Sequence, residues 1–249
     1  MIYIYPVGGL GNIFFQIASI WTLAKDNDDD LWLLNINKIN KDLIGYGRND
    51  LSYILNRFSY VIGNVDDKIQ HQFAYVPIEY KRGYEYVGYF QSEKYFKHRR
   101  AEILELFKPT DEFNVKINEY QHLFNNISLH VRHGDYYGHP EIHPIQTIEY
   151  YKNAISMLPK DLKILIFSDD LWWCKQNFIG ERFVFVNEID YISIYLMSKM
   201  KHNIIANSSF SWWGAWMSEH QDKMVIAPKK WFGNNLPYGD LVPENWIKM

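Results

Sequence analysis

The sequence predicts an α/β protein of two lobes, each with a parallel sheet covered by helices, and a cleft between them. Short apolar runs alternate with segments of helical periodicity, a pattern typical of parallel strands joined by right-handed crossovers. The length of 249 residues allows one large domain or two small ones. The alternation becomes regular after about residue 126. We therefore expect lobes at 1–125 and 126–249, and allow the last segment to return to the first lobe.

The first lobe opens with a strand, a glycine turn and a helix. In order, we expect a strand over 2–7, a helix from Ile13 to Ala24, a strand over 31–36, a strand over 84–90, and a helix that Ser92 caps and that runs to Phe107. Residues 38–83 are polar and irregular, and they predict no element.

The second lobe has a more regular pattern. We expect strands over 127–131, 162–168, 182–187, 202–206 and 224–227, and helices over 147–158, 189–200 and 210–220.

The composition excludes several classes of protein. Lys and Arg number 26 against 29 Asp and Glu, a net charge of -3, so no basic surplus indicates nucleic acid or an anionic membrane as partner. The single cysteine, Cys174, excludes a disulfide framework and a multi-cysteine zinc site, and we expect it to pack in a core. Because no secretory signal or membrane-spanning stretch is visible, we expect a soluble protein in the reducing cytoplasm.

Aromatic residues make up 17% of the chain. Most are expected to form a dense core, but rings on loops are open to a second interpretation, which is contact with a sugar. Trp212 and Trp216 are spaced i, i+4 on a predicted helix, which favours packing. Tyr136 and Tyr137 lie on a predicted loop and are the candidates for sugar contact.

Polar segments follow three strands of the second lobe. They are His130–Tyr136, Ser168–Asp170 and Asn207–Phe210. In open parallel sheets, ligands bind at the carboxyl ends of the strands. The three segments therefore predict one site at that edge.

Two features of this edge suit a phosphate. Arg132 offers a planar fork that binds phosphate through two hydrogen bonds. Ser208 and Ser209 begin a predicted helix, whose free amides and dipole favour an anion. The alternative is that Ser208 only caps the helix and Arg132 only pairs with Asp135. We favour the phosphate because both features fall at one edge.

The glycine loop of the first lobe matches a dinucleotide fingerprint only in part. Gly9 and Gly11 agree, but Phe14 replaces the third glycine, and Asn35 and Asn37 follow the second strand where an acid is required. A phosphate loop with the G-K-[ST] ending is absent from the sequence. The remaining interpretation is a turn that a ligand can approach closely.

The sequence predicts no metal site. His130 and His133 stand three apart at a strand end, where side chains alternate between faces. His139 and His143 lie in a loop and are expected to be solvated or to touch substrate. Asp28–Asp30 contains a D-x-D pattern, but it follows the first helix at the wrong end of the sheet, so we interpret it as a solvated turn.

Five segments in one order along the chain carry a resemblance to a known family. They are GGLGNIFFQ (Gly8–Gln16), GYFQSEKYF (Gly88–Phe96), HVRHGDY (His130–Tyr136), FSDD (Phe167–Asp170) and KHNIIANSSFSWWGAW (Lys201–Trp216), and APKKWF (Ala227–Phe232) also agrees. With these segments the chain resembles glycosyltransferase family 11, the family of α-1,2-fucosyltransferases. The long fifth segment is the most specific.

The resemblance implies a GT-B fold, in which two Rossmann-like lobes enclose a donor/acceptor cleft and the second lobe holds the nucleotide. It implies inverting transfer of L-fucose from GDP-fucose to a glycan acceptor, at the 2-hydroxyl of a terminal galactose, without a metal or other cofactor. It places His130 and Arg132 in a donor motif that usually reads His-x-Arg-Arg. Here His133 replaces the second arginine, and the chain is shorter than most members, so peripheral elements of the acceptor lobe are expected to be missing.

For this reaction we expect Arg132, Asp135 and Asn12 to be catalytic. Arg132 would stabilise charge on the leaving phosphate, Asp135 would either accept a proton or orient Arg132, and Asn12 would position the acceptor hydroxyl. The alternative function is a catalytically silent protein that binds a sugar or nucleotide sugar on the same fold. The expected donor-binding residues are Gly9, Gly11, Asn12, His130, Arg132, Asp169, Asp170, Asn207, Ser208, Ser209 and Phe210.

Overall fold

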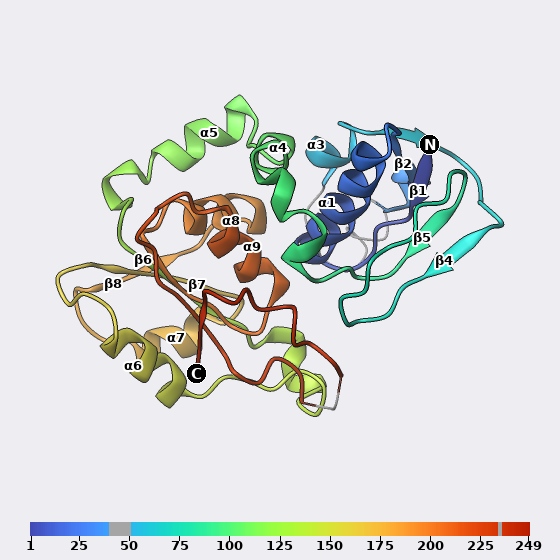
Figure 1. Ribbon diagram of the computed structural model, residues 1–249. Coiled ribbons are helices and arrows are strands. Elements are labelled where there is room, and N and C mark those ends of the chain that lie inside the picture. The colour runs from blue at the N-terminus through green and yellow to red at the C-terminus, as the bar shows by residue number, and fades with distance from the viewer. Residues whose placement is uncertain (40–50, 234–235) are drawn as a thin grey trace. The chain divides into compact units, whose positions relative to one another are not determined.

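The computed structural model describes residues 1–39, 51–233 and 236–249, and these divide into two compact units (Figure 1). Unit 1 comprises Met1–Thr110 and Pro237–Pro243, and unit 2 comprises Asp111–Leu236 and Glu244–Met249. Each unit contains a parallel sheet with helices packed on it, which confirms the predicted α/β class of two Rossmann-like lobes. No helix within the described residues is long and apolar enough to cross a membrane.

Unit 1 is built on a five-stranded sheet in the order β3-β2-β1-β5-β4. Helix α1 is buried almost all round, and Phe14, at the position of the missing third glycine, stacks on Phe107 with ring centroids 4.1 Å apart. The described elements of this unit are β1 (Ile2–Ile4), α1 (Leu10–Asp26), β2 (Leu31–Leu34), α3 (Ser52–Leu55), β3 (Ser59–Val61), β4 (Lys68–Gln70), β5 (Glu85–Val87), the 3-10 turns η1 (Glu93–Tyr95) and η2 (Lys97–Arg99), and α4 (Arg100–Leu106).

The single helix expected from Ser92 to Phe107 is wrong, because η1, η2 and α4 take its place. Ser92 does cap the first turn, and its Oγ accepts a hydrogen bond from the Lys94 backbone N–H at 3.3 Å. Phe96 then leaves the helical region, with φ -139° and ψ -4°, while its fully buried ring lies 6.0 Å from that of Phe15. Burial of the Phe96 ring therefore outweighs helix continuity.

The polar stretch 38–83, for which no element is expected, holds α3, β3 and β4. Strands β3 and β4 are three residues long and largely exposed, so they lack the apolar alternation that marks a strand. Residues 40–50 of this stretch lie outside the described part of the chain.

Unit 2 is built on a six-stranded parallel sheet in the order β11-β10-β9-β6-β7-β8. This is the 3-2-1-4-5-6 strand order of a dinucleotide-binding fold, with β6 as its first strand. Three elements of this unit were not predicted from the sequence, namely α5 (Asp111–Asn118), α7 (Leu171–Asn177) and β11 (Ile247–Lys248). The helices and strands of this unit are α5 (Asp111–Asn118), η3 (Gln121–Leu123), β6 (Ile127–Val131), η4 (Gly134–Gly138), α6 (Ile148–Ser156), β7 (Ile164–Ser168), α7 (Leu171–Asn177), β8 (Phe183–Val186), α8 (Asp190–Ser198), β9 (His202–Ile204), α9 (Ser209–Met217), β10 (Val225–Ala227) and β11 (Ile247–Lys248).

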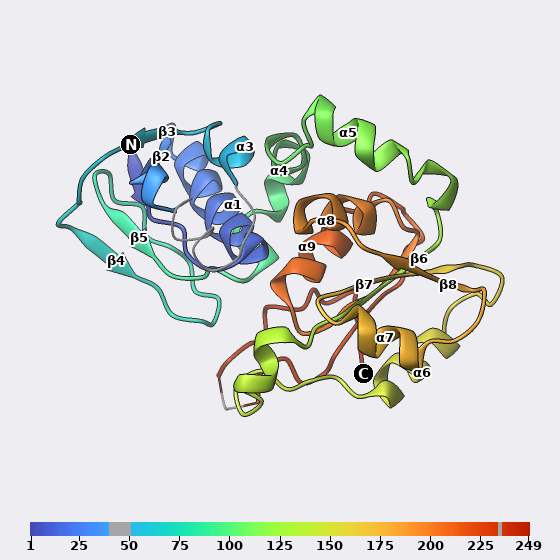
Figure 2. The ribbon, with the colours of Figure 1, turned by 180° about the vertical axis from the view of Figure 1, so that it is seen from behind.

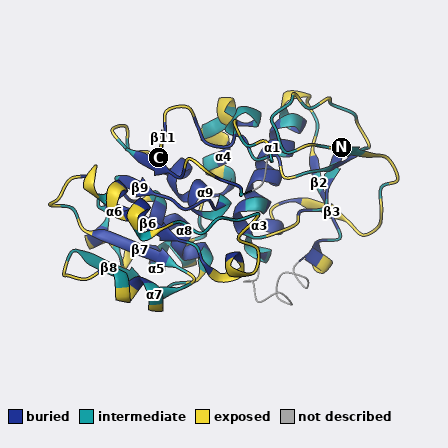
Figure 3. Ribbon diagram, turned by 90° about the horizontal axis from the view of Figure 1, so that it is seen from below, coloured by how far each residue is buried: buried dark blue, intermediate teal, exposed yellow. Residues whose placement is uncertain are grey.

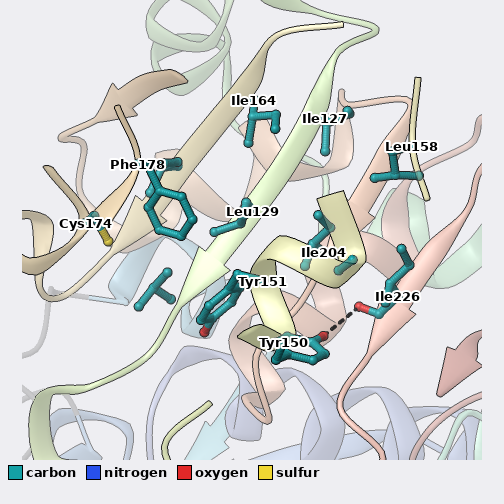
Figure 4. Close-up of a cluster of buried hydrophobic side chains, with 13 residues drawn as sticks. Ile127, Leu129, Tyr150, Tyr151, Leu158, Ile164, Cys174, Phe178, Ile204 and Ile226 are labelled. Carbon is teal, nitrogen blue, oxygen red and sulfur yellow. Dashed lines mark hydrogen bonds between the residues drawn. The ribbon is translucent and has the colours of Figure 1, made fainter. Parts of the chain in front are cut away.

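Helices α6 and α7 lie on one face of this sheet, and α8 and α9 lie on the other (Figures 1 and 2). The four central strands of the sheet are consequently buried on both faces, as the colouring of β7 shows in Figure 3. On the first face, Ile127 and Leu129 of β6 belong to one apolar cluster with Tyr151 of α6 (Figure 4). Cys174 is fully buried in this cluster, and burial raises the pKa of its thiol to about 11, which fits the predicted packing role.

Tyr150 of α6 also makes hydrogen bonds within the same cluster. Its Oη donates to the carbonyl oxygens of Ile205 and Ile226, at 2.7 and 3.2 Å, and the second bond is drawn in Figure 4. On the opposite face, Trp212 and Trp216 of α9 are buried, with ring centroids 6.0 Å apart, so their predicted packing role is confirmed.

The division between the units falls after Thr110, upstream of the expected boundary at residue 125. Helix α5 accounts for the difference, because its Phe113 packs edge-on against Tyr191 of α8 with ring centroids 4.2 Å apart. The segment that returns to unit 1 is 237–243.

Candidate functional site

The three polar segments meet at the carboxyl edge of the unit 2 sheet. Strand β6 pairs with β7 through Val131 and Ser168, and with β9 through Leu129 and Ile204, so the residues after these strands lie close together. After β8 the chain crosses to the far side of β6, so the direction of strand addition reverses between β6 and β9. Ligands of open α/β sheets bind at such a switch point.

Arg132 lies at this point and is held by two carboxylates. Its Nη2 is 2.5 Å from Asp135 Oδ1, and its Nη1 is 2.8 Å from Asp169 Oδ2. The guanidinium also lies over the ring of Tyr136, 5.3 Å from its centroid. The spacing of the sequence suggested the first pair but not the second. Two ion pairs fix the direction of a guanidinium that stays 20% exposed and can meet a ligand.

Gly134 makes this arrangement possible. Its φ is +23°, and a Cβ at this position would lie 2.4 Å from Asp169 Oδ2. The other oxygen of Asp169 accepts a hydrogen bond from the backbone N–H of His133 at 2.9 Å. The turn after β6 therefore wraps closely around a single carboxylate, and only glycine fits where it does so.

His133, which stands where the family motif has arginine, is a buried histidine with 1% exposure. Its Nδ1 lies 3.0 Å from Asp170 Oδ2, and its ring meets Trp173 edge-on at 4.6 Å. Asp170 Oδ1 in turn accepts from the Trp173 backbone N–H and caps α7. The capping bond and, second, the His133 bond lower the pKa of Asp170. One oxygen of Asp170 thus caps α7 and the other holds His133, the neighbour of Arg132.

His130, in β6, is 4% exposed, and its ring lies 5.4 Å from that of Phe210 in α9. Burial and, second, the charge of Arg132 lower the pKa of His130 to about 3, so this side chain is neutral at neutral pH. Among the described residues, its Nδ1 has no hydrogen-bond partner.

Helix α9 begins at the same edge. Ser208 is its N-cap, with an extended backbone, but within the described chain the Ser208 side chain makes no capping bond to the helix. The alternative in which Ser208 only caps α9 is therefore not supported. The first amides of α9 and the helix dipole provide the electropositive end that an anion favours.

Asn207 is fixed by hydrogen bonds within unit 2. Its Nδ2 donates to the carbonyl of Trp231 at 3.0 Å, and its Oδ1 accepts from Gln146 Nε2 at 3.0 Å. The Asn207 carbonyl accepts from Tyr136 Oη at 2.8 Å. Asn207 therefore orients the start of α9. Sequence reasoning missed Gln146, which lies in a loop without a recognisable pattern.

Two side chains of the loop after β6 are less exposed than expected. Tyr136, a candidate for sugar contact, is buried beneath Arg132 and stacks on His143 with ring centroids 4.6 Å apart. His143 is consequently half-buried and not solvated, so contact with substrate, the other expectation for this side chain, stays a prediction. His139 is exposed, and Tyr137 is 58% exposed, so contact between Tyr137 and a sugar stays a prediction.

Gly9, Gly11 and Asn12 belong to unit 1, whereas the other expected site residues belong to unit 2. Gly9 is the N-cap of α1. Gln16 fixes the loop, because its side chain bonds both the N–H and the carbonyl of Val7, at 3.1 and 2.8 Å, and the carbonyl of Asn12 at 3.0 Å.

The Asn12 side chain is held from another segment. Gln91, which follows β5, donates from Nε2 to Asn12 Oδ1 at 2.8 Å. Sequence reasoning gave Gln16 and Gln91 no role, although both lie in segments that carry the family resemblance. Their place in those segments was the available signal.

The acidic turn after α1 is solvated at Asp28 and Asp30, as expected, but not at Asp29. The Asp29 side chain is 8% exposed and accepts from Tyr80 Oη at 2.7 Å, so it is not solvated. Across the described ranges, no group of three or more His, Cys, Asp or Glu side chains could hold a metal ion.

Comparison with known proteins agrees with this geometry. The sequence model of the family described as Glycosyl transferase family 11 matches residues 60–248. The chain belongs to glycosyltransferase family 11. It is 36% identical to the O-antigen biosynthesis glycosyltransferase WbnK of Escherichia coli, over 97% of this chain and 98% of the relative. It is 31% identical to an alpha-1,2-colitosyltransferase of Escherichia coli, over 97% and 96% of the two chains.

The fold has a solved counterpart as well. The crystal structure of a family 9 glycosyl transferase from Veillonella parvula superposes with a TM-score of 0.50 at 12% sequence identity, over 100% of this chain and 84% of the other. The family 11 chain therefore has the GT-B fold that the resemblance implied.

Proposed function

We propose that this family 11 glycosyltransferase transfers L-fucose from GDP-fucose to the 2-hydroxyl of a terminal galactose, with inversion and without a metal or other cofactor. The observation that carries the donor side is the doubly paired Arg132 at the switch point of a dinucleotide-type sheet, where α9 also begins. Family membership supports glycosyl transfer, and the five motif segments support fucose as the sugar.

In the proposed reaction the acceptor oxygen forms a bond to the anomeric carbon of fucose while the bond from that carbon to the β-phosphate oxygen breaks. GDP leaves with the bonding electrons, and the acceptor hydroxyl releases its proton to the solvent. Negative charge grows on the β-phosphate, and Arg132 with the first amides of α9 would stabilise it. Loss of one preorganised donor of this kind costs about 10²–10³ in kcat.

We assign Asp135 the role of orienting Arg132. Its Oδ1 is 2.5 Å from Arg132 Nη2, so this carboxylate is engaged in holding the guanidinium. Asn12 would position the acceptor hydroxyl from the first turn of α1. Asp135→Asn keeps an oxygen for Arg132, so it should retain most of the turnover. Turnover reduced to the level of Arg132→Ala would instead make Asp135 the base.

Colitose is a second candidate for the transferred sugar, because one relative at 31% identity is an alpha-1,2-colitosyltransferase. Arg132 and the first amides of α9 would bind the phosphates of the donor, so they do not distinguish fucose from colitose. We therefore propose fucose on the motif segments and include colitose as a competing donor in the assay.

The test is incubation with GDP-fucose or GDP-colitose, with and without terminal β-galactosides, in the presence of EDTA. GDP release that depends on both GDP-fucose and a galactoside, with an α-1,2-linked product identified by NMR, is the expected result. GDP binding without release would support the silent binding protein. Release abolished by EDTA would contradict metal independence, and a preference for GDP-colitose would reassign the donor.

A further inference from the structure

We propose that Gln91 is a positioning residue that sets the direction of the Asn12 side-chain amide at the glycine loop of unit 1. This inference deepens the proposed function, because it concerns the group that would position the acceptor hydroxyl. The contact that carries it is the hydrogen bond from Gln91 Nε2 to Asn12 Oδ1 at 2.8 Å, which joins segments 79 positions apart.

The glycine loop is otherwise fixed through its backbone. Gln16 bonds both the N–H and the carbonyl of Val7 and the carbonyl of Asn12, so the main chain from β1 into α1 is held without Gln91. Gln91 instead reaches the Asn12 side chain. Its contribution is therefore to a side-chain orientation rather than to the course of the loop.

Two unfavourable features adjoin this hydrogen bond. Phe90, directly before Gln91, has φ +51°, a left-handed conformation that is uncommon for a bulky residue. In the part of the chain that is described, the buried Oε1 of Gln91 has no hydrogen-bond partner. Strained backbone and unsatisfied buried acceptors both cost free energy, and they persist where the surroundings impose them, often at functional sites.

The surroundings that impose this conformation are visible. Phe90 is 2% exposed, and its carbonyl accepts from Ser19 Oγ of α1 at 3.4 Å and from the Ser92 backbone N–H at 2.8 Å. Ser92 Oγ donates to the carbonyl of Asp240 at 3.0 Å. The chain around Gln91 is thus anchored on both sides, and the anchored conformation delivers its amide to Asn12.

The direction of the bond decides what Asn12 presents. Because Gln91 supplies the N–H, Asn12 turns its oxygen to Gln91 and its nitrogen toward the glycine turn, where a Cβ on Gly8 would lie 2.7 Å from Asn12 Nδ2. A side chain that offered only acceptors at position 91 would favour the opposite orientation. Asn12 would then present an acceptor where it now presents a donor.

Gln91→Glu tests this directly, since it keeps the shape of the side chain and replaces the donor with an acceptor. We expect kcat to fall about ten- to a hundred-fold, as for small misplacements of a reacting group, with the KM for GDP-fucose unchanged. Gln91→Leu should give a similar fall. Tyr80→Phe is the matched control, because it removes a hydrogen bond elsewhere in unit 1, from Tyr80 Oη to Asp29, and touches neither Gln91 nor Asn12. It should lower Tm while kcat stays at the wild-type value.

Two further measurements separate positioning from general damage. Adding Gln91→Leu to Asn12→Ala should cause no further loss of kcat, because Gln91 acts through Asn12. In ¹⁵N–¹H spectra without substrate, the Asn12 side-chain NH₂ signals should shift in Gln91→Glu and stay in place in Tyr80→Phe. Wild-type kcat in both Gln91 variants, a further loss in the double variant, or unmoved Asn12 signals would overturn the proposal. Absence of any fucose transfer by the wild type would count against the proposed function alone, because the spectra need no substrate.

Discussion

Gly134→Ala should displace Arg132, the proposed phosphate-binding side chain, while the fold stays intact. The added Cβ would lie 2.4 Å from Asp169 Oδ2, and ordinary contact begins at 3.4 Å, so the carboxylate must move by about 1 Å. That oxygen is the partner of Arg132 Nη1 at 2.8 Å, and the move breaks the pair. We expect about 1–3 kcal/mol of lost stability from overpacking and up to about a hundred-fold lower kcat from the misplaced guanidinium.

Gly138→Ala is the matched control, because it lies in the same 3-10 turn. Within the described chain nothing lies within 4 Å of a Cβ built there. Its stability should stay at or slightly above the wild-type value, since alanine restricts the unfolded chain.

The assays are urea denaturation for stability, calorimetric titration with GDP for affinity, and GDP release at saturating GDP-fucose for turnover. The reasoning is refuted if Gly134→Ala binds GDP and turns over like the wild type. It is also refuted if Gly138→Ala loses as much GDP affinity and turnover as Gly134→Ala, because the loss would then come from a change in the turn and not from the displacement of Asp169.

Three more predictions concern single side chains of unit 2. Arg132→Lys keeps the charge but cannot bond two carboxylates in one plane, so kcat should fall by about 10²- to 10³-fold. Turnover near the wild-type value would exclude Arg132 as the side chain that stabilises the leaving phosphate. Tyr150→Phe leaves the carbonyls of Ile205 and Ile226 without their side-chain donor, and urea denaturation should show a loss of about 1–3 kcal/mol with turnover unchanged. His130 has a folded-state pKa of about 3, below its unfolded value, so its stabilising contribution is complete above about pH 6.5 and is lost as pH falls toward 3. Between pH 6.5 and 5 the wild type should lose about 2 kcal/mol more than His130→Gln, and equal losses would contradict the burial argument.

Strands β6, β7 and β10 of unit 2 could be predicted because each is a short, largely apolar run buried on both faces. The polar edge could be predicted too, because parallel strands necessarily end together, and Arg132 and Ser208 both follow such strands. The spacing of apolar residues along the sequence reflects how a segment is buried, so it did not predict elements that bury little surface. Strand β11 has two residues, and β3 is exposed throughout.

The partners within the site could not be predicted, because a pattern along the chain does not say which side chain meets which. Asp169 reaches Arg132 from the neighbouring strand, and Gln146 reaches Asn207 from a loop. His133 shows the limit most clearly. In the sequence it stands out only as a replacement for arginine in the donor motif, whereas in the structure it is a buried partner of Asp170.

The chain passes between the two units after Thr110, after Leu236 and after Pro243, and this has a consequence for evolution and engineering. Neither unit is one continuous stretch, so a single recombination event cannot exchange one whole unit with that of a relative. A cut after Leu236 would remove both the Asp240 carbonyl that Ser92 bonds in unit 1 and the strand β11 that pairs with β10 in unit 2. Chimeras with three junctions should fold where chimeras with one junction fail. New sugar specificities in such a chain are therefore expected to arise by substitution within a unit rather than by shuffling of halves.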